Sequence, residues 1–162
     1  MTIKYGMTTF WSKHLQMNED SKSKINKELI KRKFFEGRKY VERAEEIIKL
    51  PLEEQEYLSI QLQIERIFEV LSQLILDVCT HIVSKIGKDV PETYADCVVS
   101  IAKLGILNES KIKDFINIIK MRNFIAHQYG KVDFLTVMNN FRRLLDDFQI
   151  YQNEILKWLG ND

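Results

Sequence analysis

One long segment of the 162-residue chain has the spacing of an amphipathic helix, and it constrains the fold more than any other feature. When each residue advances by about 100°, the apolar residues of this segment fall within a sector of roughly 120°. These residues are Ile64, Ile67, Phe68, Leu71, Leu74, Ile75, Val78 and Ile82. We therefore predict a long helix that follows Pro51 and ends near Ile86, with one face buried in a core.

The rest of the chain favours helices as well, since it holds only 2 prolines and 6 glycines and no bounded stretch of alternating apolar and polar residues. Capping residues and apolar spacing predict helices over about residues 24–50, 52–86, 94–104, 110–127 and 134–159. The predicted N-caps of the last three are Thr93, with Asp96 completing a capping box, then Asn108 or Ser110, and Asp133. We therefore expect an all-α, up-and-down bundle of about five helices over residues 24–160, preceded by an arm, residues 1–23, with weak apolar spacing.

Charge and composition disfavour several classes of protein. The chain carries 24 Lys+Arg against 23 Asp+Glu, and this net charge of +1 argues against general electrostatic attraction to nucleic acid or acidic lipid. Cys79 and Cys97 lie in apolar stretches without CxxC or Cys/His spacing, which disfavours a metal site and a disulfide framework. No apolar run approaches the roughly 18 residues of a membrane span, and no secretory signal is visible. We expect a cytoplasmic protein that contacts no membrane.

Polar residues replace apolar ones at the C-terminal end of the helix predicted over residues 110–127. The apolar sector of this helix is formed by Ile112, Ile116 and Ile119. Asn123 continues the sector, His127 lies next to it, and Arg122 flanks its other edge. Burying such groups without partners costs roughly 1 to 3 kcal/mol for each neutral group and more for a guanidinium. Two interpretations stay open, a buried polar cluster that fixes helix register or a functional site.

The same end of this helix also carries apolar residues outside that sector. Met121, Phe124 and Ile125 point away from it, so the helix is apolar nearly all round and should be covered on two sides. The bundle is one cover, and we expect a second copy of the chain as the other.

A line of polar residues follows the long helix opposite its apolar sector, formed by Arg66, Gln73, Asp77 and His81. For Arg66 and Gln73 we favour a solvated face, on which a helical ion pair contributes roughly 0.3 to 0.5 kcal/mol. For Asp77 two interpretations are equally good, the same solvated face or a role in holding Arg122 in place.

A basic cluster lies near the start of the first predicted helix, interrupted only by Glu28 and Glu36. Its members are Lys22, Lys24, Lys27, Lys31, Arg32, Lys33, Arg38 and Lys39. Such a run is usually a solvated helix face, and contact with nucleic-acid phosphates is the alternative interpretation.

One short motif resembles that of a known family. Residues 121–130 read Met-Arg-Asn-Phe-Ile-Ala-His-Gln-Tyr-Gly, and the spacing of Arg122, Asn123, His127 and Tyr129 is similar to the signature of HEPN-domain ribonucleases in the HepT toxin branch. Other segments resemble that branch in order and spacing, namely residues 77–82, 91–94, 105–107 and 145–148. The similarity covers about residues 24–159.

The resemblance implies a helical HEPN domain that forms a homodimer and cleaves RNA as an endoribonuclease without a metal or other cofactor. It also implies a neighbouring nucleotidyltransferase antitoxin that silences the toxin. By similarity, Arg122 and His127 are catalytic, Asn123 supports them, and Tyr129 is the hydroxyl to which the antitoxin attaches AMP.

These residue types suit RNA cleavage by the substrate's own 2'-hydroxyl. An imidazole has an ordinary pKa of about 6.5, so His127 is suited to proton transfer, and Arg122 presents a fork of donors to phosphate oxygens. Because each chain has one histidine in the motif, we hypothesise that two chains place their motifs across a shared groove. His81 is the rival second proton carrier. The competing class of function is a non-catalytic module that binds a nucleotide or a partner.

Overall fold

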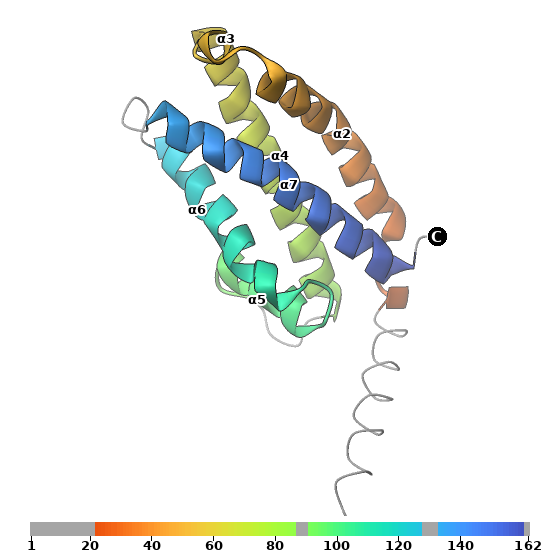
Figure 1. Cartoon of the computed structure of the whole chain (residues 1–162). Coiled ribbons are helices and arrows are strands. Elements are labelled where there is room, and N and C mark those ends of the chain that lie inside the picture. The colour runs from red at the N-terminus through yellow and green to blue at the C-terminus, as the bar shows by residue number, and fades with distance from the viewer. Residues whose placement is uncertain (1–21, 87–90, 128–132, 161–162) are drawn as a thin grey trace, which may run out of the picture.

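The computed structural model describes residues 22–86, 91–127 and 133–160, and within these ranges the chain forms α-helices, one short 3-10 helix and no strand (Figure 1). The helices are α2 (Lys27–Lys49), α3 (Leu52–Gln55), α4 (Leu58–Ile86), α5 (Tyr94–Lys103), η1 (Glu109–Lys111), α6 (Ile112–His127) and α7 (Phe134–Leu159). This confirms the predicted all-α bundle. The predicted arm, residues 1–23, lies almost entirely outside the described residues.

Local capping contacts set the helix starts. Thr93 and Asp96 form the predicted capping box at α5, and Asp133 accepts from the Thr136 amide at the start of α7. Asn108, rather than Ser110, is the cap after α5, and it begins η1, from which α6 continues. α2 begins at Lys27 because the Asn26 side chain accepts from the Leu29 amide.

The segment after Pro51 differs from the prediction of a single long helix. It forms the four-residue helix α3, then turns at Glu56 and Tyr57 before α4 begins. Gln55 explains the turn, because its buried side chain donates to the carbonyls of Ile48 and Leu50 at the end of α2. These bonds tie α3 to the end of α2, and α4 starts in a new direction.

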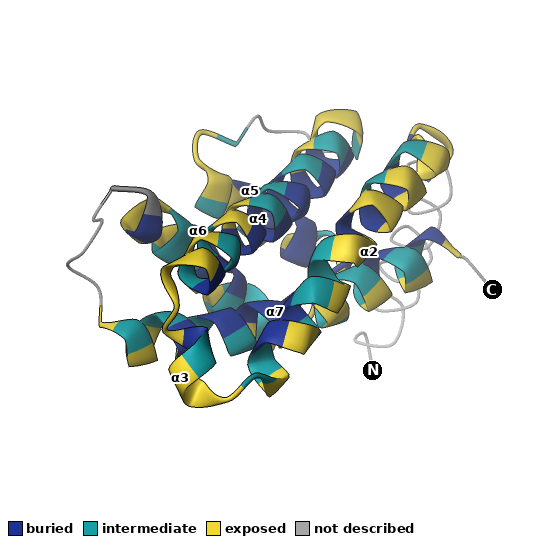
Figure 2. Cartoon of the chain, turned by 90° about the horizontal axis from the view of Figure 1, so that it is seen from above, coloured by how far each residue is buried: buried dark blue, intermediate teal, exposed yellow. Residues whose placement is uncertain are grey.

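α4 is the central helix of the bundle and packs against α2, α5, α6 and α7 (Figure 2). All eight apolar residues predicted to face the core from this helix are buried. Edge-on ring contacts join Tyr151 to Phe34 and Phe115, which connects α7 with α2 and α6. The Tyr151 hydroxyl donates to the Ile75 carbonyl at 2.9 Å, so α4 is tied to the same point.

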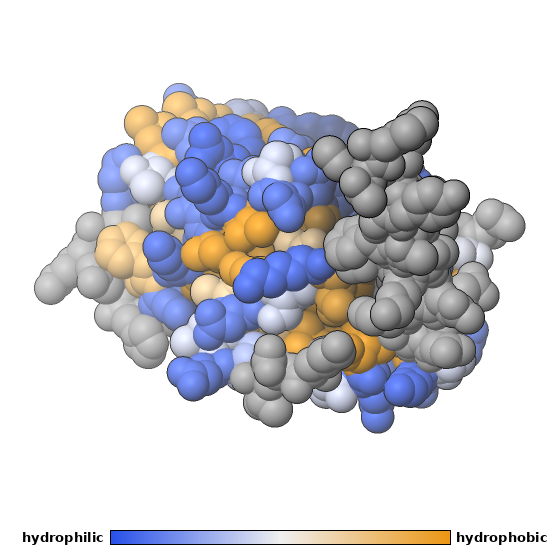
Figure 3. Space-filling view, turned by 90° about the horizontal axis from the view of Figure 1, so that it is seen from below, coloured by the Kyte–Doolittle hydropathy of each residue, from blue (hydrophilic) through white to orange (hydrophobic). Residues whose placement is uncertain are grey.

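α4 is long and apolar enough to cross a membrane by length and composition alone, which corrects the expectation that no segment approaches that length. However, 61% of its most apolar window is buried inside the bundle, and core helices of soluble proteins pass the same test. At the end of the bundle that carries α5, Figure 3 shows apolar side chains in short strips between hydrophilic ones. α4 is therefore a core helix of this fold.

Candidate functional site

Arg122 lies in the middle of the face that α6 turns toward the bundle. The buried residues on either side of it along this face are Phe115, Ile118, Ile119 and Ile125. Arg122 itself is half-buried, whereas Asn123 is exposed. The prediction that Asn123 continues the core sector is therefore wrong, as is the prediction that Ile125 points away from it. The ring contact of Phe115 with Tyr151 explains the difference, because it rotates α6 so that Phe115 faces the core.

A chain of hydrogen bonds connects Arg122 on α6 to α4 and α2. Arg122 Nη2 donates to Gln73 Oε1 at 3.0 Å. Gln73 Nε2 donates to Asp77 Oδ1 at 2.7 Å, and Lys33 Nζ donates to Asp77 Oδ2 at 2.9 Å. Asp77 therefore reaches Arg122 only through Gln73, and three helices contribute to one polar network.

The residues of this network are half-buried, and one of their donors lacks a partner. The Nε atom of Arg122 is buried and makes no hydrogen bond within the part of the chain that the structure describes. A buried unpaired donor costs roughly 1 to 3 kcal/mol, more for a charged group. A buried donor of this kind makes Arg122 a candidate functional group.

The other motif residues occupy different positions. Asn123 is exposed on α6, and His127 is the last residue of that helix. Positions 122 and 127 are about 140° apart around the helix axis, since each residue advances about 100°. Position 127 thus lies on the outer side of α6, with Asn123 and Phe124. Tyr129, the predicted modification site, lies outside the described residues.

His81 lies two helical turns beyond Gln73 on α4 and has a partner of its own. Its Nε2 atom accepts from the backbone amide of Asn26 at 3.2 Å, just before α2. Burial lowers the pKa of His81, and the nearby positive charges of Lys85 and Lys33 lower it further. The structure thus gives His81 the geometry of a neutral acceptor at the start of α2.

The basic cluster of α2 is divided among several contacts. Along the helix, Lys31, Arg32 and Arg38 pair with glutamates three or four residues away. Lys33 instead faces α4 and pairs with Asp77. These contacts agree with a mostly solvated face, in which Lys33 is the member that joins the network.

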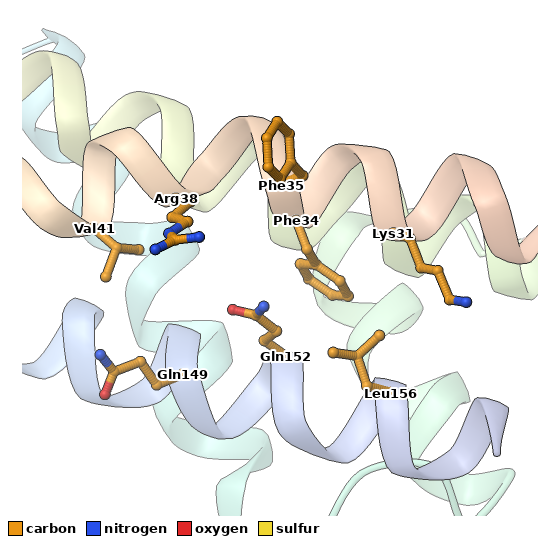
Figure 4. Close-up of a pocket in the computed structure, with 8 residues that line it drawn as sticks. All are labelled: Lys31, Phe34, Phe35, Arg38, Val41, Gln149, Gln152 and Leu156. Atoms are coloured by element: carbon orange, nitrogen blue, oxygen red, sulfur yellow. The ribbon is translucent and has the colours of Figure 1, made fainter. Parts of the chain in front are cut away.

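Two of the grooves that involve α2 lie between helices. One of about 310 Å³ lies between α2 and α7, and its lining includes Phe34, Arg38, Gln152 and Leu156; Phe34 and Leu156 point into the space between the two helices (Figure 4). The other, of about 280 Å³, lies between α2 and α4 and is lined by Lys39, Tyr40, Arg43, Gln63, Arg66 and Ile67. Arg66, predicted to be solvated, is exposed and pairs with Glu69. Neither groove is lined by Arg122.

Sequence reasoning missed two members of the network, Gln73 and Lys33. The polar face of the long helix predicts a solvated Gln73, and nothing in the basic cluster distinguishes Lys33 from its seven other members. The signal available for Gln73 was its spacing of four residues from Asp77, which allows a helical hydrogen bond. Nothing in the local sequence indicates its second partner, which lies 49 residues away.

Solved structures with the same fold include HEPN toxins. A crystal structure of a toxin–antitoxin complex with AMP-PNP matches with a TM-score of 0.74 at 14% identity, over 80% of this chain and 98% of that chain. A tri-AMPylated Shewanella oneidensis HEPN toxin in complex with its MNT antitoxin matches with a TM-score of 0.72 at 15% identity, over 79% of this chain and 96% of that chain. YutE, a cytosolic protein of unknown function from Bacillus subtilis, matches with a TM-score of 0.71 at 14% identity, over 85% of this chain and 92% of that chain. The class of fold is therefore that of the HEPN toxins.

The sequence identifies the family within this class. The model of the HepT-like ribonucleases matches residues 38–155, and the chain belongs to this family. The tRNA nuclease HepT of Aphanizomenon flos-aquae (strain 2012/KM1/D3) is 25% identical over 99 residues, which are 61% of this chain and 67% of that protein. The family match contains Arg122, Asn123 and His127, and it confirms the resemblance stated from the motif.

Proposed function

We propose that this chain is the toxin of a toxin–antitoxin pair and acts as an endoribonuclease that requires no metal or other cofactor. The observation that carries the proposal is Arg122, which a HepT-like chain holds by a side-chain network on the inner face of α6. Membership in a ribonuclease family and the fold shared with HEPN toxins support it. The proposed site of action is the cytoplasm, which the two free cysteines support.

In the proposed reaction, the 2'-hydroxyl of a ribose attacks the adjacent phosphate, and the 5'-oxygen of the next nucleotide leaves. The Arg122 guanidinium binds the phosphate oxygens, whose negative charge increases in the transition state. The His127 imidazole moves protons to or from the reacting oxygens. Asn123, one helical turn before His127, orients that ring or binds a phosphate oxygen. Transfer RNA is the first substrate to test, since the relative from Aphanizomenon flos-aquae is a tRNA nuclease.

We further propose that two chains complete one site. The helical separation of positions 122 and 127 directs them to different sides of α6, so one helix does not aim both at one phosphate. Phe124 is 38% exposed on the outer side, next to exposed Asn123, which supports a homodimer contact there. The two motifs then line one shared groove, in which the Arg122 and His127 residues of both chains flank one phosphate.

Mixed dimers test this arrangement. Arg122→Ala and His127→Ala homodimers should both be inactive, whereas a mixture refolded together should recover activity, because the shared groove of a mixed dimer keeps one Arg122 and one His127. Recovery should follow the fraction of mixed dimers measured by native mass spectrometry. Mixed dimers without activity, or a fully active wild-type monomer, would contradict the shared site.

The proposed partner is a nucleotidyltransferase antitoxin that attaches AMP to Tyr129. The AMPylated HEPN toxin of Shewanella oneidensis, which binds an MNT antitoxin, supports this part of the proposal. Added AMP groups bring bulk and negative charge, which repel the RNA backbone. Intact-mass spectra of protein made with and without the neighbouring transferase should differ by whole AMP groups, and the Tyr129→Phe variant should lose them.

The decisive experiment for catalysis is RNA incubation with purified protein in EDTA. We expect cleavage that persists with the chelator and disappears in Arg122→Ala. If the wild type cleaves no RNA with or without divalent cations, the protein is instead a non-catalytic module that binds a nucleotide or a partner, and nucleotide binding should then be measured directly.

A further inference from the structure

The hydrogen-bond chain behind Arg122 has a fixed direction. A carboxylate only accepts hydrogen bonds, so Gln73 must turn its amide nitrogen toward Asp77, at 2.7 Å from Oδ1. The amide oxygen of Gln73 is then left to face α6, where it accepts from Arg122 Nη2 at 3.0 Å. Asp77 therefore sets the orientation of Gln73, and Gln73 sets that of Arg122.

The neutral amide of Gln73 also separates the negative charge of Asp77 from the positive charge of Arg122. A carboxylate bonded directly to Arg122 would orient the guanidinium equally well, but it would offset the positive charge that a phosphate needs. Here the negative charge of Asp77 is paired with Lys33 at 2.9 Å instead. Within the described residues, Arg122 has Gln73 as its hydrogen-bond partner and no carboxylate.

We propose that Gln73 is the positioning residue of Arg122, and that Lys33 is the counter-ion that keeps Asp77 from neutralising it. The inference rests on the proposed function, in which Arg122 binds the reacting phosphate. Since Nε of Arg122 is buried and makes no hydrogen bond to any residue that the structure describes, the bond to Gln73 is the polar contact that fixes the plane of the guanidinium. A fixed guanidinium with its full charge is preorganised for an anion.

The first test removes the amide and keeps the volume. Gln73→Leu should lower kcat for RNA cleavage on the order of 10- to 100-fold, because a misplaced catalytic group costs that much, while KM changes little. The matched control is Gln63→Leu, which lies on the same helix and loses a hydrogen bond of 2.8 Å to Arg43. The control should cleave RNA like the wild type, so loss of a glutamine from α4 does not itself explain the effect.

A second readout does not depend on activity. In 15N-labelled protein, the Arg122 Nε–H should exchange slowly with solvent, because that atom is buried. In Gln73→Leu the guanidinium is released and the exchange should become fast, whereas Gln63→Leu should leave it slow.

A charged variant tests whether the neutrality of the Gln73 amide matters. Gln73→Glu places a carboxylate directly on Arg122 and a second negative charge beside Asp77, so cleavage should fall at neutral pH. As the pH is lowered, the new carboxyl binds a proton, resumes the donor role of the amide and releases the charge of Arg122. The ratio of variant to wild-type kcat should therefore rise toward low pH, which a purely structural role of Gln73 does not predict.

The outcomes are separable. If Gln73→Leu cleaves RNA as fast as Gln63→Leu and its Arg122 Nε–H stays protected, Gln73 does not position Arg122. If the ratio of Gln73→Glu to wild-type kcat does not change with pH, the neutrality of the Gln73 amide does not matter. If the wild type and Arg122→Ala are equally inactive, the proposed function fails, and the exchange measurement alone decides whether Gln73 holds Arg122.

Discussion

α4 makes two contacts of the same chemical kind, each between a glutamine oxygen and an arginine, and they differ in what surrounds them. Gln63 accepts from Arg43 of α2 at 2.8 Å, and Gln73 accepts from Arg122 of α6 at 3.0 Å. Arg43 also binds the carboxylate of Glu46 at 2.6 Å. The positive charge of Arg43 is thus neutralised directly, whereas Arg122 meets no carboxylate among the residues that the structure describes.

The other hydrogen bonds of the two glutamines explain how this difference arises. The Gln63 amide donates to the Ser59 carbonyl in its own helix, which involves no charge. The Gln73 amide donates to Asp77, and the charge of that carboxylate is paired with Lys33 on α2. The comparison teaches that the same part-buried side-chain pair holds an arginine bonded to a carboxylate in one place and, among the described residues, an arginine without a carboxylate partner in the other.

The largest expected effect separates the two arginines directly. Arg122→Ala should lower kcat/KM for RNA cleavage by about 10²- to 10³-fold, because it removes the charge that stabilises the transition state. Arg43→Ala should leave cleavage near the wild-type value, since its charge is already paired. Initial rates on one RNA at equal protein concentration are the measurement, and equal losses in both variants would remove the distinction.

A smaller effect is expected on the free energy of unfolding, where the ion pair of Lys33 can be compared with that of Arg66. Lys33 and Asp77 are 25% and 35% exposed, whereas Arg66 and its partner Glu69 are 63% and 54% exposed. Lys33→Met leaves a half-buried carboxylate without its cation and should cost about 1 kcal/mol or more of unfolding free energy. Arg66→Met breaks an exposed pair that solvent screens, so it should cost less unfolding free energy than Lys33→Met.

Urea unfolding of both variants at neutral pH measures these costs. Added salt should diminish the small effect of Arg66→Met further, because exposed pairs are screened. A Lys33→Met variant that is as stable as Arg66→Met would indicate that Asp77 does not depend on Lys33.

The sequence predicts those parts of this molecule that depend on neighbours in the chain. The capping box of Thr93 and Asp96 and the cap at Asp133 are interactions over three residues, so local reading finds them. The apolar sector of α4 is equally clear, because its opposite face is polar. In contrast, α6 carries isoleucines on more than one side, and its orientation depends on packing against distant parts of the chain, such as the contact of Phe115 with the ring of Tyr151.

The candidate site likewise has a part that the sequence predicts and a part that it does not. Arg122 could be selected from the motif alone, since the spacing to Asn123 and His127 is local. The connection of Asp77 to Arg122 through Gln73 could not be predicted. A glutamine and an aspartate four residues apart on a polar face have the pattern of a solvated pair. The partner that gives Gln73 its role lies on another helix, and only the packing of α6 against α4 brings the two together.

The smallest expected effect lies at the far end of the same polar line, at His81. Its Nε2 accepts from the Asn26 amide, and burial, followed by the charges of Lys85 and Lys33, lowers its pKa. In the unfolded chain a histidine titrates near pH 6.5, so below that pH the unfolded state binds more protons than the folded one. The contribution of His81 to stability is therefore complete above about pH 6.5 and is lost as the pH falls toward the lowered folded-state pKa.

His81→Gln isolates this effect, because an amide oxygen can accept from Asn26 but does not titrate. Between pH 7.5 and pH 5 the wild type should lose more unfolding free energy in urea than the variant does, since all other titrating groups are shared. If the unfolding free energies of the wild type and His81→Gln differ by the same amount at both pH values, protonation of His81 is not linked to folding. A histidine that must give up its hydrogen bond to bind a proton is a poor proton carrier for catalysis, so the same measurement bears on the assignment of proton transfer to His127.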